Sequence, residues 1–163
     1  SIGKKVLLLD ADIRKTAYAG QLGVEEEVKG LSQLLSGQVG LQEIIYSTNF
    51  PNMDIIFGGP SAPNPSGLLS ESVFKVFLKE VRDYYNYILI DTPPIGTVID
   101  AAVIGRYCYG AVLMIEPGNV RYKDAQRAHS QLERSGCQIL VAVMNKIDTK
   151  ADKYSPFYYT HYG

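Results

Sequence analysis

Short apolar runs recur along the chain and predict buried strands. Each run holds four to six residues, mostly Val, Ile or Leu, and several are apolar at every position. Strands buried on both faces of a parallel sheet have this pattern. The predicted strands are Val6–Leu9, Met53–Phe57, Tyr87–Ile90, Ala111–Ile115 and Ile139–Met144.

Amphipathic segments separate these strands and predict helices over residues 66–84, 97–107 and 122–135, the last closed by Gly136 as a C′ glycine. Ser66 and Asp100 stand where N-caps are expected. Alternatively, Asp100 supports a residue of the site without contacting the ligand itself. Strands that alternate with helices predict an α/β fold, with a doubly wound, mainly parallel sheet and helices on both faces.

The composition fits a globular domain followed by a tail. Of the 163 residues, 46% are hydrophobic and 20% are charged, and the net charge is −1. This balance provides no positive field for nucleic acid, and no apolar run is long enough to insert into a membrane. We expect an α/β domain over 1–149 and a tyrosine-rich tail over 150–163. Because 1–5 resembles the end of a helix, we expect an upstream strand, loop and helix outside these residues.

Carboxylates follow two of the predicted strands. Asp10 and Asp12 come directly after the first strand, and Asp91 follows the strand Tyr87–Ile90. Ligands of open parallel sheets bind at the carboxyl ends of the strands, so these side chains are expected to converge. Carboxylates that converge favour Mg²⁺, which indicates phosphoryl transfer. Alternatively, each of these aspartates is a helix cap or a solvated loop residue.

Four segments resemble the bacterial tyrosine kinase family. Val6–Arg14 resembles its Walker A′ motif, and Ile88–Pro94 resembles its Walker B strand. Asn64–Leu69 is similar to its Asn-Pro-Ser-Glu-Leu-Leu segment, with Gly67 in place of glutamate. The tail resembles its C-terminal tyrosine cluster. Because related positioning ATPases share the two Walker segments, the tyrosine cluster is the specific element.

The resemblance implies ATP and Mg²⁺ as cofactors and a role for each carboxylate. Asp10 would hold Mg²⁺ through water, and Asp91 would hold it from the Walker B side. Asp12 would accept the phenol proton of the incoming tyrosine. Arg14 would steady a phosphate, or would be a surface charge just past the strand.

The nucleotide is expected to contact Asn145, Asp91 and Pro93. Asn145 opens an Asn-Lys-Ile-Asp segment that also fits the guanine signature of GTPases. Those enzymes need a glycine where Pro94 stands, so Asn145 is interpreted as an adenine contact and Asp148 as a solvated loop residue.

The same resemblance implies autophosphorylation of Tyr154, Tyr158, Tyr159 and Tyr162, which would regulate capsular or extracellular polysaccharide synthesis or export. The expected location is the cytoplasm, at the inner face of the cell membrane, through a membrane-embedded polysaccharide co-polymerase-type activator. Unmodified tails would favour a ring-like homo-oligomer, and phosphorylated tails would favour monomers.

The 163 residues contain no Gly-x-x-x-x-Gly-Lys-[Ser/Thr] phosphate loop. We therefore expect them to bind MgATP weakly and to be inactive by themselves. Two alternatives remain open: a positioning ATPase of the same superfamily, or an inactive scaffold.

Overall fold

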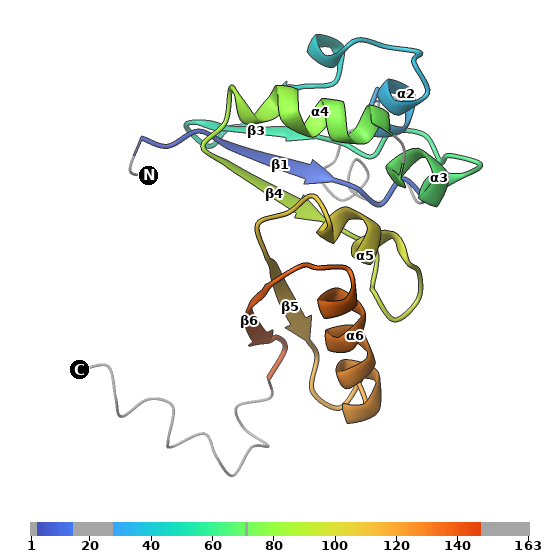
Figure 1. Cartoon of the computed structure of the whole chain (residues 1–163). Helices are drawn as coiled ribbons and strands as arrows, with labels where there is room; N and C mark the ends of the chain where they lie inside the picture. The colour runs from blue at the N-terminus through green and yellow to red at the C-terminus, as the bar shows by residue number, and fades with distance from the viewer. Residues whose placement is uncertain (1–2, 15–27, 71, 148–163) are drawn as a thin grey trace.

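The structure is a computed structural model that describes residues 3–14, 28–70 and 72–147. Figure 1 shows the arrangement of its helices and strands. The strands are β1 (Val6–Asp10), β2 (Tyr46–Ser47), β3 (Met53–Ile56), β4 (Tyr87–Asp91), β5 (Ala111–Ile115) and β6 (Ile139–Met144). The helices are α2 (Leu31–Leu35), α3 (Pro65–Ser70), α4 (Ser72–Arg82), α5 (Asp100–Gly105) and α6 (Tyr122–Arg134), with a 3₁₀ turn, η1, at Leu41–Glu43.

The strands form two hydrogen-bonded sheets. The first has the order β2-β3-β1-β4, in which β1 pairs parallel with both β3 and β4. The second contains only β5 and β6, which are also parallel. The predicted α/β class with a mainly parallel sheet is confirmed, and all five predicted strands are present. The short antiparallel strand β2 was not predicted.

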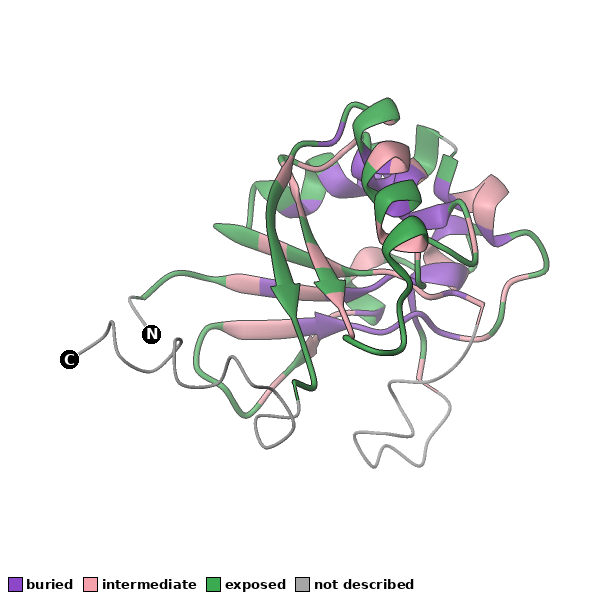
Figure 2. Ribbon diagram, turned by 90° about the horizontal axis from the view of Figure 1, so that it is seen from below, coloured by how far each residue is buried: buried purple, intermediate pink, exposed green. Residues whose placement is uncertain are grey.

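The hydrophobic core lies between the four-stranded sheet and the helices that pack on it. Leu7 and Leu9 of β1 are fully buried, and Phe74 and Val81 of α4 join the same cluster. These α4 residues recur along one face of an amphipathic helix, which is why that face covers the sheet. Figure 2 shows β5 and β6 largely exposed or only partly buried.

Three helix predictions need correction, and one is confirmed. The predicted helix 66–84 comprises two helices, α3 and α4. Ser66 is not its N-cap, since it lies inside α3, where the Asn64 side chain accepts a hydrogen bond from the Gly67 N–H. Asp100 is the first residue of α5, and Ile99 occupies the N-cap. Helix α6 ends as predicted, with Gly136 at a φ of 82°.

The tail tyrosines and Asp148 lie outside the described residues. Within the described ranges, no helix has both the length and the apolar character needed to cross a membrane.

Candidate active site at the carboxyl end of the four-stranded sheet

Asp10 ends β1 and is held rigidly by the backbone around it. Its Oδ1 accepts a hydrogen bond from the Asp12 N–H at 3.0 Å, and its Oδ2 accepts one from the Gly58 N–H at 3.3 Å. Burial raises the pKa of Asp10 to about 6, the two N–H donors oppose that rise, and the charges of Asp91 and Asp12 add to it. A carboxylate in this position favours a nearby cation.

Asp91 lies beside Asp10 because β1 and β4 are parallel and in register at these two residues. Unlike Asp10, Asp91 is exposed. Its carbonyl oxygen accepts a hydrogen bond from the Ala11 N–H at 2.9 Å, which extends the pairing of β1 and β4 by one residue. The Asp91 side chain therefore faces solvent at the edge where a ligand of this sheet would bind.

Asp12 is partly buried and lies in the loop that follows β1. Its Oδ1 accepts a hydrogen bond from the Arg14 N–H at 3.2 Å. The loop is also fixed from the side of β3, since the Ala62 N–H donates to the Ile13 carbonyl and the Ser61 hydroxyl donates to the Arg14 carbonyl, both at 2.9 Å. The segment 10–14 is thus anchored at nearly every residue.

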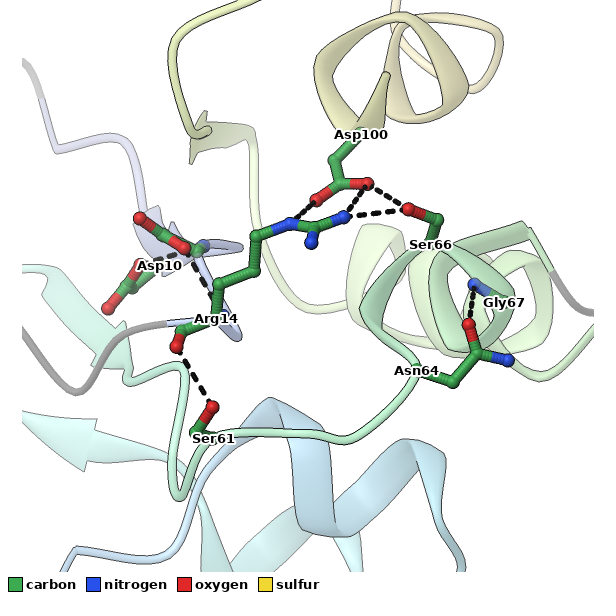
Figure 3. A network of polar contacts seen from close by, with 8 residues as sticks. Asp10, Arg14, Ser61, Asn64, Ser66, Gly67 and Asp100 are labelled. Atoms are coloured by element: carbon green, nitrogen blue, oxygen red, sulfur yellow. Dashed lines mark hydrogen bonds and ion pairs between the residues drawn. The ribbon is translucent and has the colours of Figure 1, made fainter. Parts of the chain in front are cut away.

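The Arg14 side chain forms an ion pair with the buried carboxylate of Asp100 (Figure 3). Its Nε lies 2.6 Å from Oδ2 of Asp100, whose side chain is 1% exposed. Arg14 Nη2 donates to Asp100 Oδ1 at 3.0 Å and to the Ser66 hydroxyl oxygen at 2.8 Å. Asp100 and Ser66 thus engage Nε and Nη2 of the guanidinium, while the Arg14 side chain itself is 34% exposed.

Two further residues are expected to contact the nucleotide, and they follow strands of different sheets. Pro93 is buried just after β4, whereas Asn145 follows β6 in the two-stranded sheet. The Asn145 side-chain oxygen accepts a hydrogen bond from the Lys146 N–H at 2.9 Å, so its amide NH₂ remains to donate. Lys146 also forms an ion pair with Glu116 at 2.9 Å, which joins the ends of β5 and β6 and holds the pKa of Glu116 below its usual value.

Three features of this site were not foreseen in the sequence. They are the Gly58 N–H that binds Asp10, the Arg14–Asp100–Ser66 network and the Lys146–Glu116 ion pair. The Gly58-Gly59 pair was the available signal for the first. A Cβ at Gly58 would lie 3.0 Å from the Asp12 carbonyl oxygen and 3.3 Å from Asp10 Oδ2, so only glycine leaves that carboxylate undisturbed.

The residues present suit Mg²⁺ at the strand ends. In the part of the chain that the structure describes, no three His, Cys, Asp or Glu side chains form a metal-binding group by themselves. Mg²⁺ is commonly bound by one or two carboxylates together with waters and substrate phosphates, and Asp91 with Asp10 provides such a pair.

Comparisons with known proteins identify the family of this chain. Residues 1–105 match the family model described as an AAA domain. The chain is 38% identical over 162 residues to tyrosine-protein kinase CpsD of Streptococcus pneumoniae, covering 99% of this chain and 71% of the relative. The kinase domain of the Escherichia coli tyrosine kinase ETK superimposes with a TM-score of 0.81 at 33% identity, covering 87% of this chain and 55% of that one.

A cell-division ATPase also shares the fold. The septum site-determining protein MinD of Pyrococcus horikoshii, solved with Mg-ADP, gives a TM-score of 0.68 at 26% identity, covering 88% of this chain and 58% of that one. The fold and these comparisons together define a domain of the P-loop ATPase type. Within that class, the chain belongs to the family of bacterial tyrosine kinases.

Proposed function

We propose that this chain carries the catalytic carboxylates of an ATP-dependent protein-tyrosine autokinase. The observation that carries the proposal is the difference between Asp10 and Asp12. Asp10 is buried with a backbone N–H on each oxygen. Asp12 is more accessible, and its described hydrogen bond ends on Oδ1. The second oxygen of Asp12 is therefore suited to accept a proton from substrate.

The proposed step is in-line transfer to a tyrosine. The phenol oxygen bonds to the γ-phosphorus as the bond to the leaving ADP oxygen breaks, and the phenol proton passes to Asp12. A carboxylate is a far weaker base than the phenolate that it would generate. In a loose transition state the proton leaves late, so orientation of the Asp12 carboxylate matters more than its basicity.

Asp91 and Asp10 are proposed to hold Mg²⁺, Asp91 from the Walker B side and Asp10 through water. When bound, the metal would neutralise charge on the transferring phosphate. Asn145 is proposed to donate its side-chain NH₂ to a ring nitrogen of the base, and Pro93 to line the nucleotide site. Both assignments rest on the resemblance to the family, and that of Asn145 is also supported by the hydrogen bond from the Lys146 N–H, which uses its side-chain oxygen and not its NH₂.

The proposed substrates are tyrosines of the chain's own tail, Tyr154, Tyr158, Tyr159 and Tyr162. Each phosphorylation adds about −1.5 to −2 charges and would repel the tail from a carboxylate-lined site. We expect unmodified tails to favour a ring-like homo-oligomer and phosphorylated tails to favour monomers. Light scattering of the intact protein before and after ATP treatment tests this, and an unchanged mass with fully phosphorylated tails would contradict it.

The proposed role is regulation of capsular or extracellular polysaccharide synthesis or export. The proposed location is cytoplasmic, at the inner face of the membrane, through a membrane-embedded co-polymerase-type activator. Deleting the activator should then reduce tail phosphorylation in cells while leaving the level of the kinase unchanged.

The decisive experiment compares two carboxylate variants of the intact natural protein. Asp12→Asn should lower tail phosphorylation by at least roughly 100-fold while MgATP still binds, because only the proton acceptor is lost. Asp91→Asn should instead weaken Mg²⁺-dependent nucleotide binding. Asp83→Asn, an exposed aspartate just after α4, is the matched control and should behave as wild type. Wild-type phosphorylation by Asp12→Asn would refute the assignment.

The likeness to MinD supports one alternative, a positioning ATPase without a tyrosine substrate. That function predicts ATP hydrolysis by the intact protein with no phosphotyrosine formed, which one radiolabelled assay separates from the kinase. The 163 residues alone, without a phosphate loop, are expected to bind MgATP weakly. Micromolar binding in calorimetry would contradict that expectation.

A further inference from the structure

The Arg14 side chain joins three segments that are distant in the sequence. Arg14 lies just after β1, Ser66 lies in α3 and Asp100 begins α5, 86 residues from Arg14. The three side chains form a closed set of hydrogen bonds, since the Ser66 hydroxyl donates to Asp100 Oδ1 at 2.6 Å and accepts from Arg14 Nη2 at 2.8 Å. Figure 3 shows this network between the loop and the two helices.

The Asp100 carboxylate of this network carries its negative charge in the interior of the fold. Asp100 is fully buried, and burial alone would raise its pKa. The hydrogen bonds from Arg14 and Ser66 outweigh that effect and hold the pKa of Asp100 below its usual value, so the carboxylate stays ionised. Two-pronged pairing of a guanidinium with a carboxylate also fixes the direction of the arginine side chain.

The backbone of the same arginine holds Asp12. The Arg14 N–H donates to Asp12 Oδ1 at 3.2 Å, and the Arg14 carbonyl accepts from the Ser61 hydroxyl at 2.9 Å. A movement of Arg14 is therefore passed directly to the Asp12 carboxylate. The Arg14 guanidinium is bound to Ser66 of α3 and Asp100 of α5. The backbone amide of the same residue holds the Asp12 carboxylate.

We propose that Arg14 and Asp100 are positioning residues that form a clamp and orient the Asp12 carboxylate toward the substrate phenol. The proposal rests on the proposed kinase function. It differs from the expectation that Arg14 steadies a phosphate, because it assigns the role of Arg14 to Nε and Nη2, which contact Asp100 and Ser66.

The first test needs no nucleotide and no activity. In the intact protein, Arg14→Lys keeps the charge but cannot reproduce the two-pronged contact with Asp100. Hydrogen–deuterium exchange over residues 10–14 should become faster, because the amide of residue 14 loses the side-chain anchor that holds it against Asp12 Oδ1. Arg121→Lys is the matched control, since Arg121 makes the same Nε–Oδ2 contact with Asp124 at 2.8 Å on the exposed surface of α6. Unchanged exchange over 10–14 in Arg14→Lys would overturn the clamp.

The second test separates positioning from phosphate binding. A displacement of about 1 Å can cost roughly 100-fold in rate, so Arg14→Lys and Asp100→Asn should each lower kcat by roughly 10- to 100-fold. KM for MgATP should stay near the wild-type value in both variants. The double variant should be no slower than the slower single variant, because both changes break one contact. A raised KM for MgATP with unchanged kcat in Arg14→Lys would show a phosphate ligand and overturn the proposal.

Ser66→Ala provides a milder variant if Asp100→Asn fails to fold. It removes one donor to Asp100 and leaves the Arg14–Asp100 pair in place, so a smaller drop in kcat in the same direction is expected. An unaltered kcat in Ser66→Ala together with an unaltered kcat in Arg14→Lys would overturn the clamp. If Asp12→Asn proves as active as wild type, the proposed function fails, whereas faster exchange in Arg14→Lys would still show the contact.

Discussion

The central strand β1 and the strands of the two-stranded sheet are all largely apolar, but they are buried to very different extents. In β1, Leu7 and Leu9 are fully buried. In the two-stranded sheet, Val112 of β5 is 53% exposed, and Leu140 and Met144 of β6 are 50% and 54% exposed. An apolar run therefore identifies a strand that needs cover on both faces, but it does not identify the segment that covers it.

The difference follows from the neighbours of each strand. β1 is central, with β3 and β4 on its two sides and α4 against the same core. β5 pairs only with β6, and α6 is the helix that contacts both. Among the described residues, β4 and β5 each keep one edge without a strand partner, and such edges readily accept another strand.

The largest difference in the free energy of unfolding is expected between variants of the two ion pairs at the strand ends. Arg14→Ala leaves the buried Asp100 carboxylate without its cation and should lower the free energy of unfolding by about 3 to 5 kcal/mol. Lys146→Ala removes the partner of Glu116 at an exposed site and should leave the unfolding midpoint unchanged. Urea denaturation of the intact protein measures both, and equal losses would remove the contrast.

A second contrast compares one buried and one exposed apolar side chain. Leu9→Ala should cost about 2 to 5 kcal/mol, because it opens a cavity in the core. Met114→Ala in β5 should cost less than about 1 kcal/mol, because that side chain is 56% exposed. The same denaturation series checks this, and a similar cost at both positions would show that the two-stranded sheet is covered in solution.

Glycine substitutions test how tightly the loop beside Asp10 is packed. A Cβ at Gly30 would lie 2.3 Å from the Gly59 nitrogen and 2.4 Å from the Phe57 carbonyl oxygen, so backbone atoms must separate. Gly30→Ala should cost about 1 to 3 kcal/mol. Gly96→Ala, after β4, meets no atom within 4 Å and should change stability by less than about 0.5 kcal/mol. Equal thermal midpoints for the two variants would argue against the close contact.

The smallest expected effect is a pH dependence centred on Asp10. Burial raises its pKa from 3.8 to about 6 in the folded protein, so the folded state holds a proton that the unfolded state has released. Wild type should therefore lose roughly 1 to 2 kcal/mol relative to Asp10→Asn as the pH rises through the interval between these pKa values. Denaturation midpoints of both proteins at pH 4 and pH 7 measure the difference. A constant difference would show that Asp10 keeps an ordinary pKa.

The local pattern determined which segments are strands and where the candidate chemistry follows them. The predictions for β5 and β6 match the structure residue for residue, and β1 and β4 extend one residue further, into Asp10 and Asp91. Both aspartates end parallel strands that pair in register, so their proximity follows from the strand assignment. Residues 148–163 lie outside the described ranges, and the phosphorylation of the tail tyrosines stays a prediction.

The partner of each polar side chain was decided only by the tertiary structure. Asp100 and Ser66 have the residue types of helix caps, and a cap is satisfied by its own helix. Instead, packing of α3 against α5 buries Asp100 and brings Arg14 to it across 86 residues of sequence. Strand propensity and the pattern of hydrophobic residues are properties of neighbouring residues, so the sequence determines them directly. The pairing of one buried charge among many candidates depends on which helices meet, and only the folded chain determines that.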